Sequence, residues 1–181
     1  AKEPFQFLQL AIEYYKVVIT KTQHLWFVPI GVDATCSGLQ LLSGCLRDEK
    51  GMKHSNVLTP SNPDDKPEDA YILVLDKAKE LAQVKDKDLI PYLIHRALGK
   101  TTMVMLYGAT TYTVKQKVKA VFQDLNQYGK NKEVTSEMCQ RMALLLEKAS
   151  AKVFPLAFTA LSWLKKLAKN WNVYFEKINT S

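Results

Sequence analysis

The sequence has few of the features that mark a secreted, zinc-binding or membrane protein. It contains only three cysteines, and none has zinc-ligand spacing beside the three histidines. We interpret these cysteines (Cys36, Cys45 and Cys139) as reduced core thiols of an intracellular protein. No apolar run approaches the roughly 20 residues that span a bilayer. The first residues, AKEPF, also lack the basic start and apolar core of a signal peptide. The sequence therefore predicts no membrane segment.

The charge is unevenly distributed along the chain. Residues 1–76 carry 7 basic and 10 acidic side chains, a net charge of −3, whereas residues 77–181 carry 18 basic and 8 acidic ones, a net charge of +10. A basic second half suits binding to a polyanion, because lysine and arginine that neutralise phosphates supply salt-dependent affinity. The same composition also fits a solvated, lysine-rich helical surface. With 181 residues, 47% of them hydrophobic, the chain suits one good-sized domain or parts of two.

Residues 27–48 (FVPIGVDATCSGLQLLSGCLRD) are the most informative stretch. Its apolar, β-branched beginning predicts a short buried strand over 27–32. Asp33 follows at the carboxyl end of this strand, and a small-residue turn and apolar positions of helical spacing come next. A carboxylate in this place can present a ligand to Mg²⁺, which prefers carboxylates together with phosphates and water. The alternative is that Asp33 only caps the following helix.

The run DATCSGLQ, which starts at Asp33, resembles a known catalytic motif. Together with RD at positions 47–48, it is similar to the first motif of the single-subunit, bacteriophage-type RNA polymerases, a family that includes mitochondrial enzymes. The resemblance implies that Asp33 and the backbone carbonyl of Ala34 hold catalytic Mg²⁺. It also implies that Gly38, without a side chain, leaves room for the 2′-hydroxyl of a ribonucleotide. The family's second metal-binding Asp lies in a His-Asp-Ser motif, and this triplet does not occur in the sequence.

Residues 94–108 (IHRALGKTTMVMLYG) form the second informative stretch. In a continuous helix of about 100° per residue, Arg96, Lys100 and Tyr107 share one narrow face. Two cations and an aromatic ring on one face can grip a triphosphate and stack on a base. The stretch resembles the second motif of the same family. This implies that Arg96 and Lys100 bind the triphosphate, that Tyr107 and Gly108 close over the nascent base pair, and that Lys100 and Tyr107 contribute to catalysis.

The spacing of the second motif departs from the family pattern. Six residues separate Lys100 from Tyr107, one fewer than in the family. We keep Arg96 and Lys100 as the phosphate ligands, because the charges must reach the triphosphate. In the alternative register, His95 and Gly99 occupy the family's Arg and Lys positions. A further alternative makes the two cations solvated surface residues and Tyr107 a core residue.

Apolar residues at helical spacing predict helices in most of the remaining sequence. The predicted ranges are 4–22, 67–83, 111–126, 135–152 and 155–174. Residues 48–68 contain three prolines and many charges, and they predict a loop with a short strand at 56–58. Tyr71 falls where the polymerase family has a tyrosine near its active centre. The resemblance implies a substrate-binding role for Tyr71, and a core position is the alternative.

These features together predict a mainly α fold with a small β element. The resemblance implies part of the palm and the fingers of a right-handed, A-family-like polymerase. Residues 1–50 are expected to belong to the palm and to carry the metal-binding Asp33. Residues 51–181 are expected to form a helical, fingers-like subdomain.

The resemblance implies a fragment of a DNA-directed RNA polymerase. Such an enzyme uses two Mg²⁺ ions to add ribonucleoside triphosphates to an RNA 3′ end. Its expected partners are a DNA template and an RNA product, and no membrane partner is expected. The fragment is expected to be inactive in isolation, because half of the metal cage is missing. Its expected location is intracellular, in the cytoplasm of a phage-infected host or in an organelle. One alternative is a fragment of an A-family DNA polymerase. Gly38 opposes it, because those enzymes have at this position a bulky acid that excludes the ribose 2′-hydroxyl. The other alternative is a basic helical nucleic-acid-binding module without catalysis.

Overall fold

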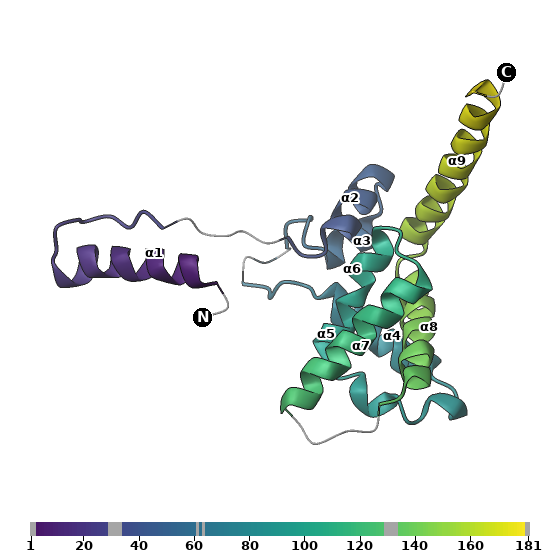
Figure 1. The fold of residues 1–181 in the computed structure, drawn as a ribbon, viewed down its shortest axis with the longest axis horizontal. Helices are drawn as coiled ribbons and strands as arrows, with labels where there is room; N and C mark the ends of the chain where they lie inside the picture. The colour runs from purple at the N-terminus through teal and green to yellow at the C-terminus, as the bar shows by residue number, and fades with distance from the viewer. Residues whose placement is uncertain (1–2, 29–33, 61, 63, 129–133, 180–181) are drawn as a thin grey trace. The chain divides into compact units, whose positions relative to one another are not determined.

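The computed structural model describes residues 3–28, 34–60, 62, 64–128 and 134–179, with residues 126–128 and 172–179 described in their backbone only (Figure 1). The chain divides into two compact units, Ala1–Ala34 and Thr35–Ser181. Throughout the described ranges the regular structure is helical. The mainly α prediction is therefore confirmed, and the predicted small β element has no counterpart among the described residues.

The first unit consists of a helix and a segment that returns along it. Helix α1 (Pro4–Tyr14) has proline in its first turn and continues as the π-helical turn η1 (Tyr15–Ile19). Glu13 is the buried residue of α1, and its carboxylate accepts hydrogen bonds from the Phe27 backbone N–H (3.1 Å) and the Gln23 side chain (2.7 Å). These two donors, the Phe27 N–H above all, lower the pKa of Glu13. An ionised carboxylate therefore fastens the returning segment to α1.

The second unit contains most of the helices labelled in Figure 1. They are α2 (Ser37–Leu46), α3 (Glu49–His54), α4 (Ala70–Leu81), α5 (Arg96–Gly99), α6 (Thr101–Leu106), α7 (Thr111–Tyr128), α8 (Ser136–Val153) and α9 (Pro155–Asn179), with 3₁₀ turns at Val84–Asp86 and Ile90–Tyr92. The long helices agree with the predicted ranges to within a few residues. Thr135, where one predicted helix begins, is the N-cap of α8, and its side chain accepts a hydrogen bond from the Met138 N–H (3.2 Å).

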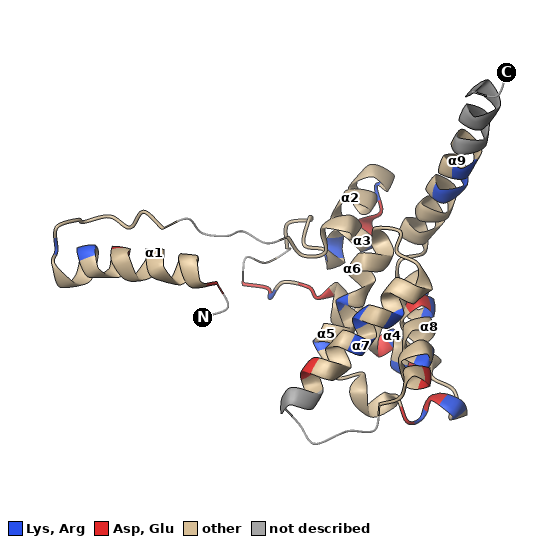
Figure 2. Ribbon diagram, viewed as in Figure 1, with Lys and Arg blue, Asp and Glu red and all other residues tan. Residues whose placement is uncertain are grey.

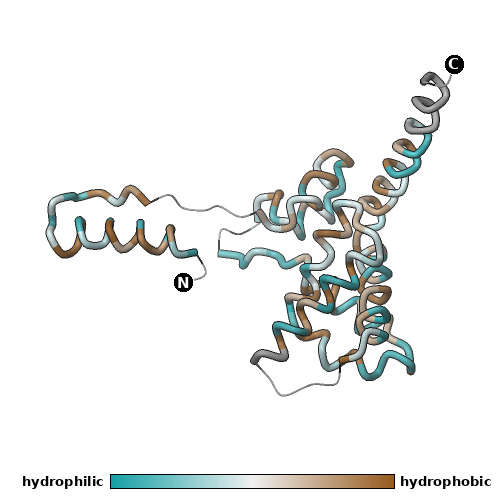
Figure 3. Tube along the Cα trace, viewed as in Figure 1, coloured by the Kyte–Doolittle hydropathy of each residue, from teal (hydrophilic) through white to brown (hydrophobic). Residues whose placement is uncertain are grey.

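The core of this unit lies around α8, against which both α4 and α7 pack. Figure 3 shows apolar and polar residues alternating along α7 and α8, a pattern typical of helices with one buried face. The largest fully buried apolar side chains are Phe154, Leu39, Leu75, Leu89, Leu93, Leu98, Met142, Leu146, Val74, Val114 and Val118. None of the described helices is long and apolar enough to cross a membrane.

Helix α3 corrects the prediction of an irregular loop over residues 48–68. It packs against α2 through Gly51, where an added Cβ would lie 2.0 Å from Ser43 Oγ. The contact requires glycine at this position, and tertiary packing thereby selects a helix in a sequence rich in loop-forming residues. The predicted strand at 56–58 is wrong: Asn56 adopts a left-handed conformation (φ 59°) and the Val57 N–H donates to the Met52 carbonyl (2.9 Å). The segment is a turn that ends α3.

The predicted strand over 27–32 lies mostly outside the described residues. Its first two residues, Phe27 and Val28, are described and have no strand structure. The predicted division into residues 1–50 and 51–181 differs in position from the observed units, which meet between Ala34 and Thr35. Whether these parts correspond to palm and fingers stays a prediction.

Candidate nucleotide-binding site

The two sequence motifs meet where α2 lies against α6. Ser37, the first residue of α2, hydrogen-bonds through its hydroxyl to the hydroxyl of Tyr107, which is 70 residues away in the sequence. A Cβ added to Gly38 would lie 3.1 Å from Leu106 Cβ and 3.3 Å from Tyr107 Cε1. The absence of a side chain at Gly38 therefore lets the Tyr107 ring pack directly on α2.

The second motif is a broken helix. The predicted continuous helix over 94–108 is wrong at Lys100, where α5 ends and α6 begins. The Lys100 N–H donates to the Arg96 carbonyl (3.1 Å), whereas the Met103 N–H donates to the Lys100 carbonyl (3.1 Å), a tighter, three-residue step. Arg96, Lys100 and Tyr107 are nevertheless all exposed.

Gly99 allows the short helix α5 to pack closely against α4. A Cβ added to Gly99 would lie 2.6 Å from the Tyr71 carbonyl oxygen, so α5 rests directly on the first turn of α4. Position 99 therefore faces α4, and a lysine there would meet the α4 backbone. Lys100 is exposed and has no hydrogen bond or ion pair within the described part of the chain.

Arg96 is held by two groups at the beginning of α4. Its Nε donates to Oδ2 of Asp69, and its guanidinium carbon lies 4.8 Å from the centroid of the Tyr71 ring. Asp69 is also the N-cap of α4, because its Oδ1 accepts hydrogen bonds from the N–H groups of Tyr71 (2.9 Å) and Ile72 (3.3 Å). Partial burial alone would raise the pKa of Asp69, but the Arg96 and backbone hydrogen bonds outweigh it and lower the pKa.

Tyr71 is buried beneath Arg96 rather than open to solvent. Its side chain is 5% exposed, and its hydroxyl donates to Met103 Sδ (3.9 Å). Burial and the neighbouring Cys36 raise the pKa of Tyr71 to about 12, so the phenol is neutral at physiological pH. In this arrangement Tyr71 supports the guanidinium with its ring face.

Gly108 ends α6 in a conformation that favours glycine (φ 81°). A Cβ added there would lie 3.5 Å from Cε of Lys165, so α9 brings a lysine beside the Tyr107–Gly108 turn. Figure 2 shows Lys and Arg in blue along α7 and α9, the helices that carry much of the basic charge of the second half.

The metal-binding prediction depends on residues at the junction of the two units. Asp33 lies outside the described residues, and Ala34 is an exposed residue of the first unit. The described residues contain no group of three or more His, Cys, Asp or Glu side chains that could hold a metal. A carboxylate and a carbonyl are hard oxygen ligands that suit Mg²⁺, but they supply only part of its octahedral shell. The donor chemistry of Asp33 and Ala34 therefore suits Mg²⁺, and whether they bind it stays a prediction.

Two residues of this arrangement were missed from the sequence. Ser37 lies within the first motif, and Asp69 lies in the first turn of the helix predicted over 67–83, close to where Asp commonly acts as a cap. The capping signal was present for Asp69. Its pairing with Arg96, 27 residues further on, depends on tertiary structure.

Comparison with known proteins confirms the resemblance to the RNA polymerase family. The profile of a family described as DNA-dependent RNA polymerase matches residues 1–179. The DNA-directed RNA polymerase of Enterobacteria phage T3 is 26% identical over 201 residues, which cover 92% of this chain and 22% of the relative. The chloroplastic/mitochondrial DNA-directed RNA polymerases 2B of Nicotiana tabacum and 2 of Arabidopsis thaliana are each 24% identical, over 93% of this chain and 18% of the relative. The chain thus spans about a fifth of the length of these relatives. It belongs to the phage- and organelle-type DNA-dependent RNA polymerase family.

Proposed function

We propose that this chain carries part of the active site for template-directed RNA synthesis. In the proposed reaction, the 3′-hydroxyl of an RNA attacks the α-phosphate of a ribonucleoside triphosphate, and pyrophosphate leaves. The observation that supports the proposal best is the contact between the two motifs, in which Ser37 and Gly38 meet Tyr107. Residues far apart in the sequence are thereby brought together as one nucleotide site requires.

Asp33 and the Ala34 carbonyl are proposed to hold Mg²⁺. Two bound Mg²⁺ ions would supply activation of the attacking hydroxyl and charge stabilisation at the phosphate. The chain's own cations would bind the rest of the triphosphate. Arg96 offers a planar fork of donors, and Lys100 offers an exposed point charge without a competing partner among the described residues.

Tyr107, Gly38 and Gly108 are proposed to contact the sugar and the base of the nucleotide. The Tyr107 side chain is 62% exposed, so its ring is free to meet a base while its edge rests on α2. A bulky acid at position 38 would displace this ring and occupy the space beside the ribose. Glycine therefore favours ribonucleotides, and this supports an RNA polymerase over the alternative of an A-family DNA polymerase.

The nucleic-acid partners are proposed to be a DNA template and an RNA product. The lysines of α7 and α9 offer positive charge for their phosphates, with a salt-dependent contribution to affinity. We assign residues 1–50 to the palm and 51–181 to a fingers-like subdomain. The proposed location is intracellular, as for phage and organellar polymerases.

The chain by itself is proposed to be inactive. The sequence has one carboxylate for the metal site and lacks the His-Asp-Ser triplet of the family. We expect the 181-residue chain to yield no extended product in a primer-extension assay with DNA template and Mg²⁺. Extension by the isolated chain would contradict the proposed division of the metal site.

Asp33→Asn in a polymerase of full family length that carries this chain tests the proposal. The substitution keeps the shape of the side chain and removes its charge, and we expect the rate of ribonucleotide addition to fall by more than about a hundredfold. Asp64→Asn, at an exposed position in the loop before α4, is the matched control and should leave the rate unchanged. Addition at the wild-type rate by the Asp33→Asn enzyme would overturn the proposal.

A further inference from the structure

Asp69 connects the beginning of α4 to Arg96, and the polymerase motifs do not include it. One carboxylate oxygen caps the helix, and the other accepts a hydrogen bond from Nε of Arg96. We infer that Asp69 is a positioning residue, which holds Arg96 in the orientation that binds the triphosphate. The inference rests on the proposed function, in which Arg96 is a triphosphate ligand.

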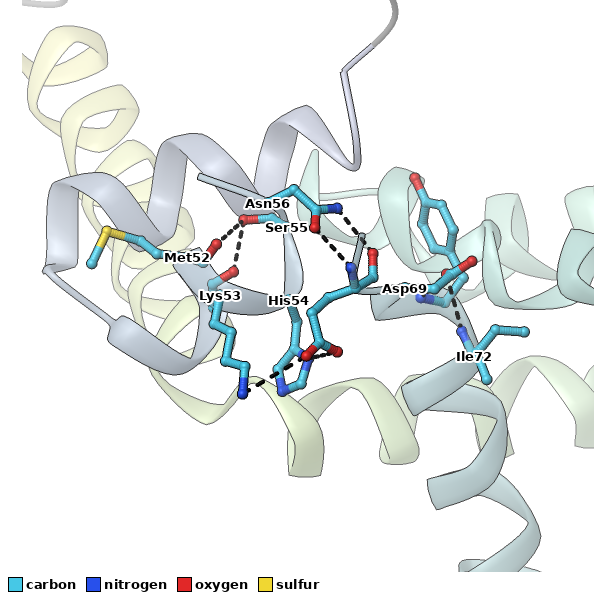
Figure 4. A network of polar contacts seen from close by, with 10 residues as sticks. Met52, Lys53, His54, Ser55, Asn56, Asp69 and Ile72 are labelled. Atoms are coloured by element: carbon cyan, nitrogen blue, oxygen red, sulfur yellow. Dashed lines mark hydrogen bonds and ion pairs between the residues drawn. The ribbon is translucent and has the colours of Figure 1, made fainter. Parts of the chain in front are cut away.

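Figure 4 shows the contacts on either side of Asp69, which are the hydrogen bond from the Ile72 N–H to the Asp69 carboxylate and the polar network that attaches the preceding residue, Glu68, to α3. The side chain of Asn56 pairs with the backbone of Glu68, donating to its carbonyl (2.9 Å) and accepting from its N–H (2.8 Å). The Glu68 carboxylate in turn pairs with Lys53 (3.7 Å) and with His54 Nδ1 (3.2 Å) of α3. The backbone on both sides of Asp69 is therefore held in place, by the attachment of Glu68 to α3 before it and by the first turn of α4 after it.

Two contacts limit the orientation of the Arg96 guanidinium. The Asp69 carboxylate accepts a hydrogen bond at its Nε edge, and the Tyr71 ring packs against one of its faces. Contact through Nε leaves the two terminal nitrogens of Arg96 without a hydrogen-bond partner among the described residues. The Arg96 side chain remains 45% exposed, so these nitrogens are accessible to an anion. A free arginine samples many rotamers, and a prior hydrogen bond lowers the entropy lost when it binds phosphate.

Asp69→Asn separates orientation of Arg96 from helix capping. Asn caps helices about as well as Asp, but it loses the charged acceptor for Arg96. In a polymerase of full family length, we expect KM for ribonucleoside triphosphates to rise by about three- to tenfold while kcat changes little. At neutral pH the thermal midpoint should fall only slightly, because the helix cap is kept and an ion pair this exposed contributes little to stability. Asp69→Ala should raise KM similarly and also lower the midpoint, because the cap is lost.

Two further variants make the outcome decisive. Asp76→Asn changes a carboxylate of the same helix that pairs with Lys79 (2.8 Å), and it should leave KM unchanged. Arg96→Ala should raise KM, and adding Asp69→Asn to it should have no further effect. An unchanged KM in Arg96→Ala would overturn the proposed role of Arg96. A raised KM in Arg96→Ala with an unchanged or lowered KM in Asp69→Asn would overturn only the inference about Asp69.

Discussion

Replacing Gly99 with alanine tests the packing that holds the second motif on α4. The new methyl group would lie 2.6 Å from the Tyr71 carbonyl oxygen and 2.8 Å from Tyr71 Cβ. Carbon atoms ordinarily meet at about 3.5–4.0 Å, so α5 must move away from α4 by about 1 Å. Overpacking of this kind costs about 1–3 kcal/mol. The better helix propensity of alanine returns at most about 1 kcal/mol.

The net expectation for Gly99→Ala is a loss of about 1–2 kcal/mol in the free energy of unfolding, with a fall of about 2–8 °C in the thermal midpoint. Urea denaturation followed by far-ultraviolet circular dichroism measures the change. Gly44→Ala in α2 is the matched control, because no atom lies within 4 Å of its added Cβ. The control should be neutral or stabilised by up to about 1 kcal/mol. If Gly99→Ala is as stable as Gly44→Ala, the close approach of α5 and α4 is wrong.

Two other predictions concern stability. In Gly51→Ala the new Cβ would lie 2.0 Å from Ser43 Oγ, so urea denaturation should show a loss of about 1–3 kcal/mol. Adding Ser43→Gly should recover part of the loss, and a failure to recover any would contradict the packing of α3 on α2. The pKa of Asp69 is lowered in the folded state, so its contribution to stability is present above the unfolded pKa of about 3.9 and disappears as pH falls through the folded pKa. The small stability difference between the wild type and Asp69→Asn should therefore shrink as pH falls from about 5 through the folded pKa, whereas a constant difference would contradict the Asp69–Arg96 pair.

The sequence was sufficient to predict the positions of helices whose apolar residues recur at regular helical spacing. Helices α7, α8 and α9 are long and amphipathic, and the predicted ranges agree with them closely. Helix α3 was missed because it has only six residues, and its packing on α2 depends on the small size of Gly51. The predicted continuous helix through Lys100 was wrong because a uniform rotation per residue ignores the contact of Gly99 with α4.

The residues of the candidate site were likewise predicted only in part. The resemblance to the two polymerase motifs selected Arg96, Lys100, Gly38 and Tyr107 as site residues, and the structure brings Gly38 against Tyr107. The role of Asp69 could not be predicted, since its contact with Arg96 forms only after α4 and α5 pack together. The position of a side chain relative to a distant partner is a property of tertiary structure, and a single sequence does not contain that geometry.

The central claim is that the two motifs form one ribonucleotide site. A double-mutant cycle of Ser37→Ala and Tyr107→Phe tests it, with kcat/KM for ribonucleotide addition measured in a polymerase of full family length. Each substitution removes one side of the hydroxyl–hydroxyl contact. We expect the double variant to be no worse than the more impaired single variant, because both changes break the same interaction. If the two effects instead multiply as independent losses, the motifs do not act together and the account is wrong.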